Sequence, residues 1–508
     1  MKKFRLLALL CVSLQLLTSQ AAIVVTVDST RCQTVTGFGG AACFGAMEPN
    51  RDVEIIKKLY GADSEIGLNI MRVEISPNLK GDISYSDVGW DTPYDWKGSL
   101  PAAQEGVKRG ALIFGTPWSP PAPFKTNGIA GGGNSEQQGF QRGKLNPEFY
   151  DRFFIWLNMF LSYMKQNGVP IYAVSLQNEP DWWVDYSGCL YEPEELHTLV
   201  KDWAWKLDRK QYGVKLISAE PLGFDERFSD ILLNDTATRK HIDIVAGHLY
   251  GHPPFTHMIK AANTAHKYGK EVWMTEHSVE NGWDASIGAQ RNGLPTWHEE
   301  LIFAEELNEC MLAGGTGYIY WYMQAHWAFI GTGEQQHMPG NEKGKVLRRA
   351  YVMSHFSKNV TGSTRLNHTM NFKTATNAPF ESSAYIKGDS LIVMAIDTTK
   401  NAVDINLTLP YPVKSCEQWL STEEAVCQKT PVDMASSTKQ LTLPVPARSL
   451  VTYIFQIDRQ AMAIADQPQT APVVETAYDL QGRRVDDSSR GFCIVRFSNG
   501  CTKKIFRP

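Results

Sequence analysis

Two glutamates each come directly after an apolar run of the sequence. Glu179 ends the stretch that begins with Ile171–Leu176, and Glu276 ends the one that begins with Val272–Met274. A surface strand alternates polar and apolar residues, so continuous apolar runs predict strands that are buried on both faces. If the two carboxyl groups lie about 5 Å apart, one can protonate a leaving oxygen while the other attacks an anomeric carbon. That is the chemistry of a retaining glycosidase.

The residues alone do not select this pair. Glu74 and Glu220 also stand at the ends of apolar runs, and they could serve in salt bridges, in sugar binding or in catalysis. No His-Glu-x-x-His or Cys-x-x-Cys pattern occurs, so we predict neither a metal site nor a cofactor.

The segments that must position these glutamates alternate between short apolar runs and longer helical stretches from residue 36 to 358. Repeated βα units of this kind predict a (β/α)8 TIM barrel, whose active site lies at the C-terminal ends of its strands. The expected strands are Gly37–Phe44, Leu68–Ile75, Ala111–Thr116, Ile171–Gln177, Val214–Glu220, Ile242–Tyr250, Val272–His277 and Tyr318–Tyr322. The expected helices include Pro147–Asn167, Pro193–Lys210, His257–Tyr268, Glu299–Gly314 and Leu347–Lys358.

Beyond the barrel the pattern changes to short alternating segments. Residues 359–457 are expected to form an antiparallel β-sandwich, and the strand at 22–35 is expected to join it from the other side of the barrel. Residues 458–473 are predicted to be a linker, and 474–508 a small β tail.

The two ends of the chain suggest export. Residues 1–21 combine an early positive charge, an apolar stretch and small residues, which predicts a signal peptide and a secreted or cell-surface protein. No later apolar run is long enough to span a bilayer. The net charge of −4 without a long basic run argues against a nucleic-acid partner. We expect a monomer whose partner is a polysaccharide substrate.

Three cysteine pairs are near neighbours in the sequence and could form disulfides: Cys32/Cys43, Cys416/Cys427 and Cys493/Cys501. Cys189 and Cys310 are expected to be buried free thiols.

Five motifs along the predicted barrel, taken together and in order, resemble glycoside hydrolase family 30. The resemblance implies that Glu179 is the acid/base on the fourth strand and Glu276 the nucleophile on the seventh. The motifs are Gly37-Phe38-Gly39-Gly40-Ala41, Met71-Arg72-Val73-Glu74-Ile75-Ser76-Pro77, Gly115-Thr116-Pro117-Trp118-Ser119-Pro120-Pro121, Gln177-Asn178-Glu179-Pro180-Asp181 and Trp273-Met274-Thr275-Glu276-His277.

The xylanase branch of that family is the most similar, through Asp185-Tyr186-Ser187-Gly188-Cys189, Gly247-His248-Leu249-Tyr250-Gly251 and Ser354-His355-Phe356-Ser357-Lys358. This implies β-1,4-xylan as substrate. It also implies that the sugar under attack contacts Trp118, Asn178, Tyr250 and Trp321, with Trp96 as a further aromatic platform. Indoles can stack on xylose rings, and an amide can hydrogen-bond the 2-hydroxyl as charge develops. His248 and His277 are expected to hydrogen-bond substrate or Glu276.

One departure bears on specificity. Glucuronoxylanases of this branch carry arginine after the aromatic run of the eighth strand, whereas this chain has Gln324 and Ala325. Without that bidentate carboxylate clamp, we expect an endo-xylanase that does not strictly depend on glucuronic acid side groups. His326, Lys343 or Lys345 could replace the clamp only if the insert at 327–345 folds over the site.

Several alternatives stay open. They are an exo-acting xylanase, a β-1,6-glucanase, a glucosylceramidase-like hydrolase and a non-catalytic carbohydrate-binding barrel. The C-terminal tail also resembles a Bacteroidetes secretion signal, with a simple accessory β element as the alternative.

Overall fold

The computed structural model describes residues 22–43, 52–77, 96–251, 255–278, 283–284, 289–290, 295–324, 328–333, 340–371, 379–465, 474–479, 481–486, 489–497 and 502–507. The predicted signal peptide lies outside these residues. Within them, no helix is both long enough and apolar enough to cross a lipid bilayer.

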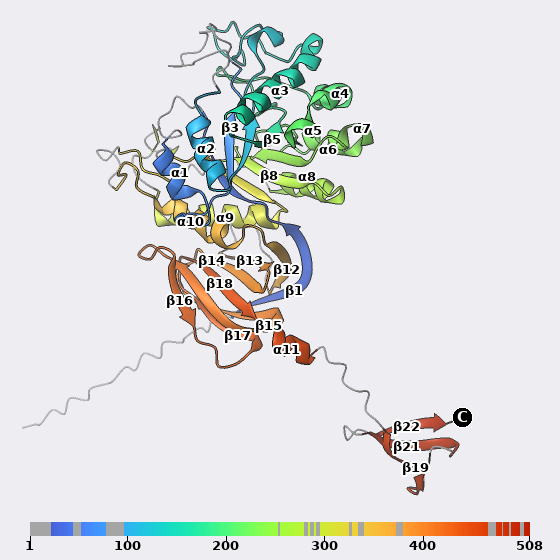
Figure 1. The fold of residues 1–508 in the computed structure, drawn as a ribbon. Coiled ribbons are helices and arrows are strands. Elements are labelled where there is room, and N and C mark those ends of the chain that lie inside the picture. Colours follow the sequence, from blue (N-terminus) through green and yellow to red (C-terminus); the bar gives the residue numbers. More distant parts are fainter. Residues whose placement is uncertain are drawn as a thin grey trace, which may run out of the picture.

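Parallel strands form a closed barrel at the centre of the larger body (Figure 1). Around the barrel the strand order is β11, β2, β3, β4, β5, β6, β7 and β8, and β8 pairs back to β11. The strands are β2 (Gly37–Ala41), β3 (Ile70–Glu74), β4 (Leu112–Thr116), β5 (Ile171–Ser175), β6 (Lys215–Ile217), β7 (Ile244–His248), β8 (Glu271–Glu276) and β11 (Gly317–Tyr322). Two short strands, β9 (Trp283–Asp284) and β10 (Ala289–Gln290), pair after β8.

Helices surround this barrel, as the alternating pattern predicts. They are α1 (Val53–Leu59), α2 (Leu100–Lys108), α3 (Tyr150–Gln166), α4 (Pro193–Trp203), α5 (Arg209–Tyr212), α6 (Arg227–Asn234), α7 (Thr236–Arg239), α8 (Thr256–Lys267), α9 (Trp297–Leu312) and α10 (Arg348–Asn359). Short 3-10 turns cover Ala122–Phe124, Pro147–Phe149 and Ala204–Lys206. A capping box of Thr296 and Glu299 starts α9, where a helix was expected.

Side chains fill the inside of the barrel, so it is a packed core and not a pore. Ile70, Phe114, Ile217, Trp273 and Ile319 belong to one buried cluster there. The glycine-rich sequence of β2 allows the strands to approach closely, because a Cβ on Gly39 would lie 2.0 Å from the carbonyl oxygen of Ile70.

The side domain is a sheet that folds over itself around its own core, and it is antiparallel except for the parallel pairing of residues 23–26 with 405–408. It contains β1 (Ile23–Thr34), β12 (Thr364–Met370), β13 (Phe380–Lys387), β14 (Ser390–Asp397), β15 (Val403–Ser421), β16 (Gln428–Val432), β17 (Thr438–Val445) and β18 (Ser449–Ile457). The long β15 belongs to both layers, since its first half pairs with β17 and β1 and its second half with β18 and β16. The predicted α/β barrel with an attached β side domain is confirmed.

The N-terminal strand ties the two domains together. β1 pairs with β12 and β15 in the side domain, and only two residues separate it from β2 in the barrel. Helices α9 and α10 pack on the side domain through buried polar contacts. The Nδ1 of His355 lies 2.7 Å from the Thr452 hydroxyl oxygen, and Asn308 Nδ2 donates to Glu381 Oε2 at 2.9 Å.

Two details differ from the sequence prediction. Residues Arg459–Ala465, placed in the predicted linker, form helix α11, because the Asp458 side chain accepts hydrogen bonds from the backbone N–H of Gln460 and Ala461. Met462 then packs against the side-domain core.

The cysteines also differ from the pairing that their spacing allowed. Cys32, Cys43, Cys416 and Cys427 are free thiols. Cys189 and Cys310 are buried free thiols, as expected. The third possible pair involves Cys501, which lies outside the described residues.

The C-terminal tail forms its own small antiparallel sheet, of β19 (Val474–Asp479), β20 (Arg484–Val485), β21 (Gly491–Phe497) and β22 (Thr502–Arg507).

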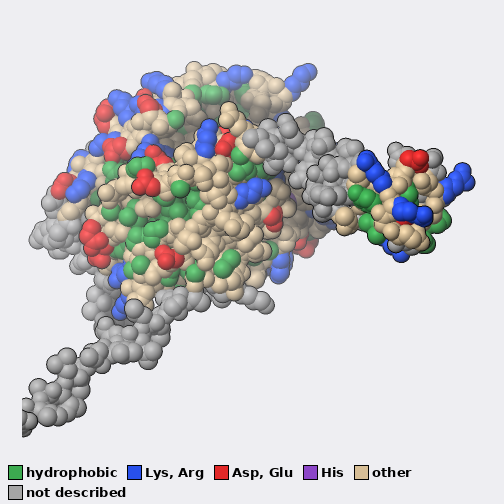
Figure 2. Space-filling view, turned by 90° about the horizontal axis from the view of Figure 1, so that it is seen from below, with side chains coloured by type: hydrophobic (Ala, Val, Ile, Leu, Met, Phe, Trp, Pro, Cys, Tyr) green, Lys and Arg blue, Asp and Glu red, His purple; other side chains and the backbone are tan. Residues whose placement is uncertain are grey.

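On the face of the molecule seen from below, acidic and basic side chains are interspersed among hydrophobic ones (Figure 2).

Glu381 makes the contact between barrel and side domain sensitive to pH. Burial and the nearby Glu309 and Glu305 of α9 raise the pKa of Glu381 to about 8, although its hydrogen bond from Asn308 acts in the opposite direction. The folded protein therefore holds a proton there that the unfolded chain has already lost. The free energy of unfolding should fall as pH rises from about 4.5 to about 8, by up to about 1.4 kcal/mol per pH unit.

Urea denaturation of the wild type and of Glu381→Gln between pH 5 and 8 checks this expectation. The variant should show a shallower pH dependence, whereas Glu424→Gln, on an exposed turn of the same domain, should behave like the wild type. Equal slopes for the wild type and Glu381→Gln would contradict the assignment.

Candidate active site

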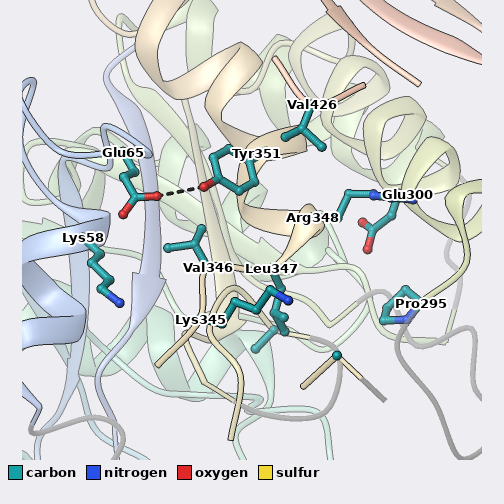
Figure 3. A pocket seen from close by; sticks show the side chains of 12 residues that line it. Lys58, Glu65, Pro295, Glu300, Lys345, Val346, Leu347, Arg348, Tyr351 and Val426 are labelled. Carbon is teal, nitrogen blue, oxygen red and sulfur yellow. Dashed lines mark hydrogen bonds between the residues drawn. The ribbon is translucent and has the colours of Figure 1, made fainter. Parts of the chain in front are cut away.

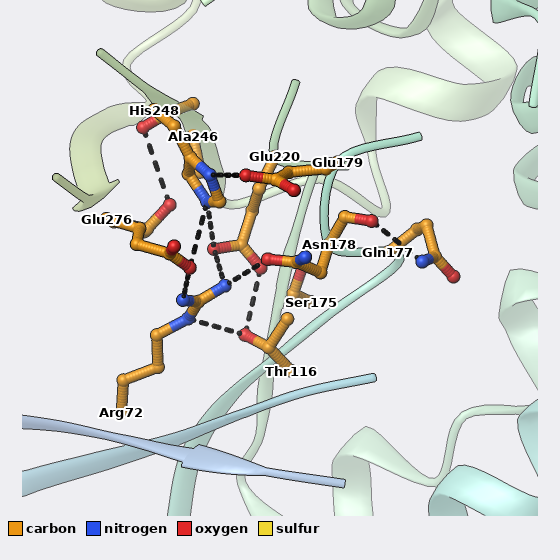
Figure 4. Close-up of polar contacts among 12 residues, drawn as sticks. Arg72, Thr116, Ser175, Gln177, Asn178, Glu179, Glu220, Ala246, His248 and Glu276 are labelled. Atoms are coloured by element: carbon orange, nitrogen blue, oxygen red, sulfur yellow. Dashed lines mark hydrogen bonds and ion pairs between the residues drawn. The ribbon is translucent and has the colours of Figure 1, made fainter. Parts of the chain in front are cut away.

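The polar side chains named by the sequence patterns converge at the C-terminal ends of the barrel strands (Figure 4). Arg72 lies near the end of β3, Glu276 is the last residue of β8, and His248 is the last residue of β7. Asn178 and Glu179 follow β5, and Asn178 forms an isolated bridge with Glu220, which follows β6. Parallel strands of a closed barrel end at one rim, so residues distant in sequence meet there.

Arg72 is the centre of this group. Its guanidinium donates to Glu276 Oε2, to Asn178 Oδ1 at 2.8 Å and to Glu220 Oε2 at 3.1 Å. Its Nε also donates to the Thr116 hydroxyl at 3.3 Å. The Arg72 side chain is fully buried. A buried charge is strongly destabilising unless paired, and here residues at the ends of four other strands supply its partners.

Glu220 is fully buried and contacts Arg72, so its carboxylate does not reach the surface of the site. Burial would raise the pKa of Glu220, but Arg72 and His248 outweigh it and lower the pKa to about 2. Thr116 also donates to Glu220 Oε1 at 2.9 Å. A carboxylate with these partners stays ionised and balances the charge of Arg72. Glu220 is therefore a positioning residue.

His248 connects the carboxylates. Its Nδ1 lies 3.1 Å from Glu179 Oε1, and its Nε2 lies 3.6 Å from Glu220 Oε2 and 3.9 Å from Glu276 Oε2. Burial would lower the pKa of His248, but the three carboxylates raise it to about 9. The imidazolium then donates to Glu179. The prediction that His248 bonds to Glu276 or to substrate missed this main contact with Glu179.

Opposing influences act on the pKa of Glu276. Burial and Glu179 raise the pKa of Glu276, whereas His248 and Arg72 favour its ionised form. Arg72 holds Oε2 of the carboxylate, so the other oxygen is the one that can react. Tyr250 hydrogen-bonds the same glutamate through its hydroxyl, and burial together with the charge of Glu276 raises the pKa of Tyr250 well above its usual value.

Glu179 lies in an unusual backbone conformation. Its φ of 42° is in the left-handed region, which is costly for a residue with a side chain. Its N–H donates to the Glu220 carbonyl at 2.9 Å, and Gln177 Nε2 donates to the Trp118 carbonyl at 2.7 Å. Tyr186 OH lies 3.5 Å from Glu179 Oε2. These contacts hold the carboxyl at the rim despite the strain.

The two carboxylates are close. Glu179, His248 and Glu276 offer ligand atoms that all lie within 4.8 Å of one another. These residues could in principle hold a metal ion, but the positive charge of Arg72 on Glu276 opposes a cation there. The same short separation suits a proton donor and a nucleophile acting on one bond.

An aromatic wall stands beside the pair. The rings of Trp118 and Trp321 have centroids 5.6 Å apart, and the Arg72 guanidinium carbon lies 4.5 Å from the Trp118 ring centroid. The ring of Tyr250 lies 5.1 Å from that of His277. The structure thus brings together Trp118, Asn178, Tyr250 and Trp321.

Trp96 is placed elsewhere. Only 5% of its surface is exposed, its ring packs edge-on against Phe160 and close to Tyr163, and its Nε1 donates to the Ser76 carbonyl. These contacts place Trp96 against α3, apart from the aromatic rings of Trp118 and Trp321, and its role as a sugar platform stays a prediction.

His277 and Gln324 both have hydrogen-bond partners outside the catalytic group. His277 Nδ1 lies 2.8 Å from Glu306 Oε1, behind the rim, so this histidine does not bond to Glu276 as the sequence suggested. Gln324 Nε2 donates to the Gly331 carbonyl at 2.6 Å and is buried. Ala325 and His326 lie outside the described residues. Lys345 is 3.4 Å from Glu342.

Arg72 was the main residue that sequence reasoning left without a role. The available signal was a charged residue inside the apolar run Ile70–Ile75, which predicts a buried charge with partners on neighbouring strands.

The charge of His248 can be measured directly. Because three acidic side chains surround its imidazole, its NMR titration should give an apparent pKa near 9, and Glu179→Gln should lower that pKa by removing the acidic partner of Nδ1. Labelled histidine side chains in the wild type, in Glu179→Gln and in a His248→Asn variant, which assigns the signal, provide the measurement. A pKa at or below the ordinary value of about 6.5 would contradict this account.

Comparison with known proteins shows which enzymes this chain resembles. The glycosyl hydrolase catalytic-core family matches residues 154–302, which include Glu179 and Glu276. Glucuronoxylanase XynC of Bacillus subtilis is 26% identical over 441 residues, covering 85% of this chain and 92% of that protein. An endo-1,6-beta-D-glucanase of Neurospora crassa is 25% identical over 178 residues, or 31% of this chain and 36% of that protein.

A solved structure extends the similarity to both domains. The family 30 subfamily 8 xylanase Xyn30A of Clostridium acetobutylicum is 28% identical, with a TM-score of 0.68, and the match covers 85% of this chain and 99% of that one. The chain is therefore a glycoside hydrolase, and its barrel and side domain have the same fold as this family 30 xylanase.

Proposed function

We propose that this glycoside hydrolase is a secreted, retaining endo-xylanase that cleaves β-1,4-xylan by double displacement, with Glu179 as acid/base and Glu276 as nucleophile. The observation that carries the proposal is the separation of the two carboxylates, whose closest oxygens lie within 4.8 Å of one another. Retaining enzymes keep their carboxyl groups about 5 Å apart, whereas inverting enzymes leave about 6.5–9.5 Å for a water molecule.

In the first step Glu276 attacks the anomeric carbon through the oxygen that Arg72 does not hold. Glu179 donates its proton to the leaving oxygen at the same time. His248 bonds to Oε1 of Glu179, so Oε2 is the oxygen that presents the proton. In the second step Glu179 takes a proton from water, and that water breaks the ester on Glu276.

The sugar contacts follow from fixed side chains. Asn178 Oδ1 accepts from Arg72, which makes its amide nitrogen the donor for a 2-hydroxyl group. A hydrogen bond there strengthens as charge develops at the anomeric centre. The indoles of Trp118 and Trp321 offer apolar faces suited to a xylose ring.

The substrate assignment rests on relatives and on Gln324. Proteins named as a glucuronoxylanase and a xylanase match most of this chain. The Gln324 side chain bonds to the backbone of Gly331 instead of presenting a positive charge. This supports cleavage of xylan without strict dependence on glucuronic acid.

β-1,6-Glucan is the second candidate substrate, since a fungal endo-1,6-beta-D-glucanase matches 31% of this chain. Glucosylceramide-like substrates and an exo-acting mode would use the same two glutamates. Export through the signal at 1–21, and sorting by the tail, belong to the proposal for localisation.

Replacing either catalytic carboxyl tests the mechanism. Glu179→Gln and Glu276→Gln should each lower kcat/KM on xylan by about 10³-fold or more, because the first removes the transferable proton and the second the nucleophile. Glu226→Gln, in a carboxylate bound to His257 and Lys260 outside the site, is the matched control and should keep wild-type activity. Both assignments fail if the two active-site variants retain activity close to that of the control.

Product analysis tests the substrate. Glucuronoxylan, arabinoxylan, unsubstituted xylan and β-1,6-glucan are digested separately and the products are sized. We expect internal cleavage of all three xylans at rates within about tenfold of each other, since the cleft lacks the arginine clamp whose charged contact would be worth about 1.5–3 kcal/mol. Products from glucuronoxylan alone, or from β-1,6-glucan alone, would overturn the assignment.

A further inference from the structure

A second recess is lined by residues of α1, of α10 and of the segment that precedes α10 (Figure 3). Its volume is about 840 Å³. It lies between α1, the start of α10, the residue before the α9 capping box and a turn of the side domain. Pockets of about 300–1,000 Å³ hold ligands of several rings. None of its lining residues belongs to the catalytic group.

Three cations line this recess, and two of them, Lys58 and Arg348, have backbone carbonyls as partners. Lys58 Nζ donates to the Gly344 carbonyl, and Arg348 Nη2 donates to the Glu423 carbonyl at 2.8 Å. Among the described residues, neither lies within ion-pair distance of a carboxylate. Lys345 is 3.4 Å from Glu342 at the surface, where both side chains are about half exposed and such a pair is weak.

The acidic residues of the recess are already engaged. Glu65 Oε2 accepts from the Tyr351 hydroxyl at 2.8 Å, and Glu300 Oε2 accepts from Arg349 Nε at 3.1 Å in a buried ion pair. Among the described residues of the lining, Lys58 and Arg348 have no carboxylate partner and Glu65 has no cationic partner, so positive charge exceeds negative charge by one.

The first turn of α10 adds to the positive charge of the recess. The helix begins at Arg348, and the side chain of its N-cap residue, Leu347, makes no capping hydrogen bond. The positive end of a helix dipole thus points into a recess that already contains cations.

Apolar side chains form the rest of the lining, among them Pro295, Ala328, Val346, Leu347 and Val426. A small inorganic anion would leave that surface uncovered. A ligand that combines a carboxylate with apolar ring faces would use both parts.

We infer that the recess is a second binding site for an oligosaccharide bearing a uronic acid, with the carboxylate received by Lys58, Lys345 and Arg348. This rests on the proposed function, because it makes the ligand an acidic branch of the same polysaccharide. The segment that follows the barrel's last strand connects the two sites. Gln324 bonds to the Gly331 carbonyl, and the Gly331 N–H bonds to the Lys345 carbonyl at 2.9 Å. Gln324 stands in the cleft where an arginine would bind the carboxylate of a uronic acid. In this protein the cations that could bind that carboxylate line the recess instead.

Calorimetry on full-length protein in the Glu276→Gln background, which prevents turnover, tests the site. The probe is a xylotetraose carrying one glucuronic acid, compared with unsubstituted xylotetraose. Lys58→Gln/Lys345→Gln should weaken binding of the acidic probe by about tenfold, because it removes two positive charges from the recess that receives the carboxylate. Binding of the neutral probe should not change.

Two controls keep the outcome decisive. Lys57→Gln alters a neighbouring lysine of α1 that pairs with Glu54 and does not line the recess, so it should bind both probes like the parent protein. Lys345→Gln alone changes a half-exposed side chain and should keep the fold while reducing affinity for the acidic probe.

The inference is overturned if the double variant binds the acidic probe as tightly as the parent, or if inorganic phosphate displaces that probe at equal concentration. Xylan hydrolysis is assayed separately in a Lys58→Gln/Lys345→Gln variant that keeps Glu276, and it should be unaffected on unsubstituted xylan. A wild type that leaves xylan intact would refute the proposed function, whereas loss of selective binding refutes only the second site.

Discussion

The buried guanidinium of Arg72 is the interaction on which the rest of the site depends. Isolated in the barrel, its charge would be strongly destabilising, so its position requires Glu276, Glu220 and Asn178 from three other strands to be present together. In return it fixes one oxygen of Glu276 and the amide of Asn178. The Trp118 ring, 4.5 Å from the guanidinium carbon, covers it from the side of the cleft.

This constraint explains why the chemistry needs a closed barrel. Arg72 and its most distant partner, Glu276, are 204 positions apart in the sequence, and only the common rim of parallel strands brings them within hydrogen-bond distance. The side domain supports the rim indirectly. β1 continues into β2, and α9 and α10 bury polar contacts against β13 and β18.

Much of this arrangement could be predicted from the sequence, for a physical reason. Strands buried on both faces are continuous apolar runs, so β3, β5 and β8 were visible, and so were the glutamates at or beyond their ends. The pairing of β1 with the side domain followed from its alternating pattern. What a pattern cannot give is the direction of a single side chain. Trp96 and Trp118 look alike in sequence, yet one packs against α3 and the other stands over Arg72.

The charges of the active-site residues could not be predicted from the sequence either. His248 could be named as a hydrogen-bonding residue, but its elevated pKa depends on three carboxylates that come from different strands. The helix at Arg459–Ala465 was missed because its start depends on the capping contacts of Asp458 within a stretch of linker-like composition. Cys32 and Cys43 do not pair, since Cys43 lies in the core beside Trp118 and Trp321 while Cys32 belongs to the side-domain strand β1.

The central claim is that the spacing of Glu179 and Glu276 leaves no room for a water molecule to attack the substrate directly. The configuration of the first product tests it most directly. Proton NMR of a xylo-oligosaccharide during the first minutes of hydrolysis reports the anomer that is released before mutarotation. The account predicts that the β-anomer appears first and the α-anomer grows later. Initial release of the α-anomer would contradict it.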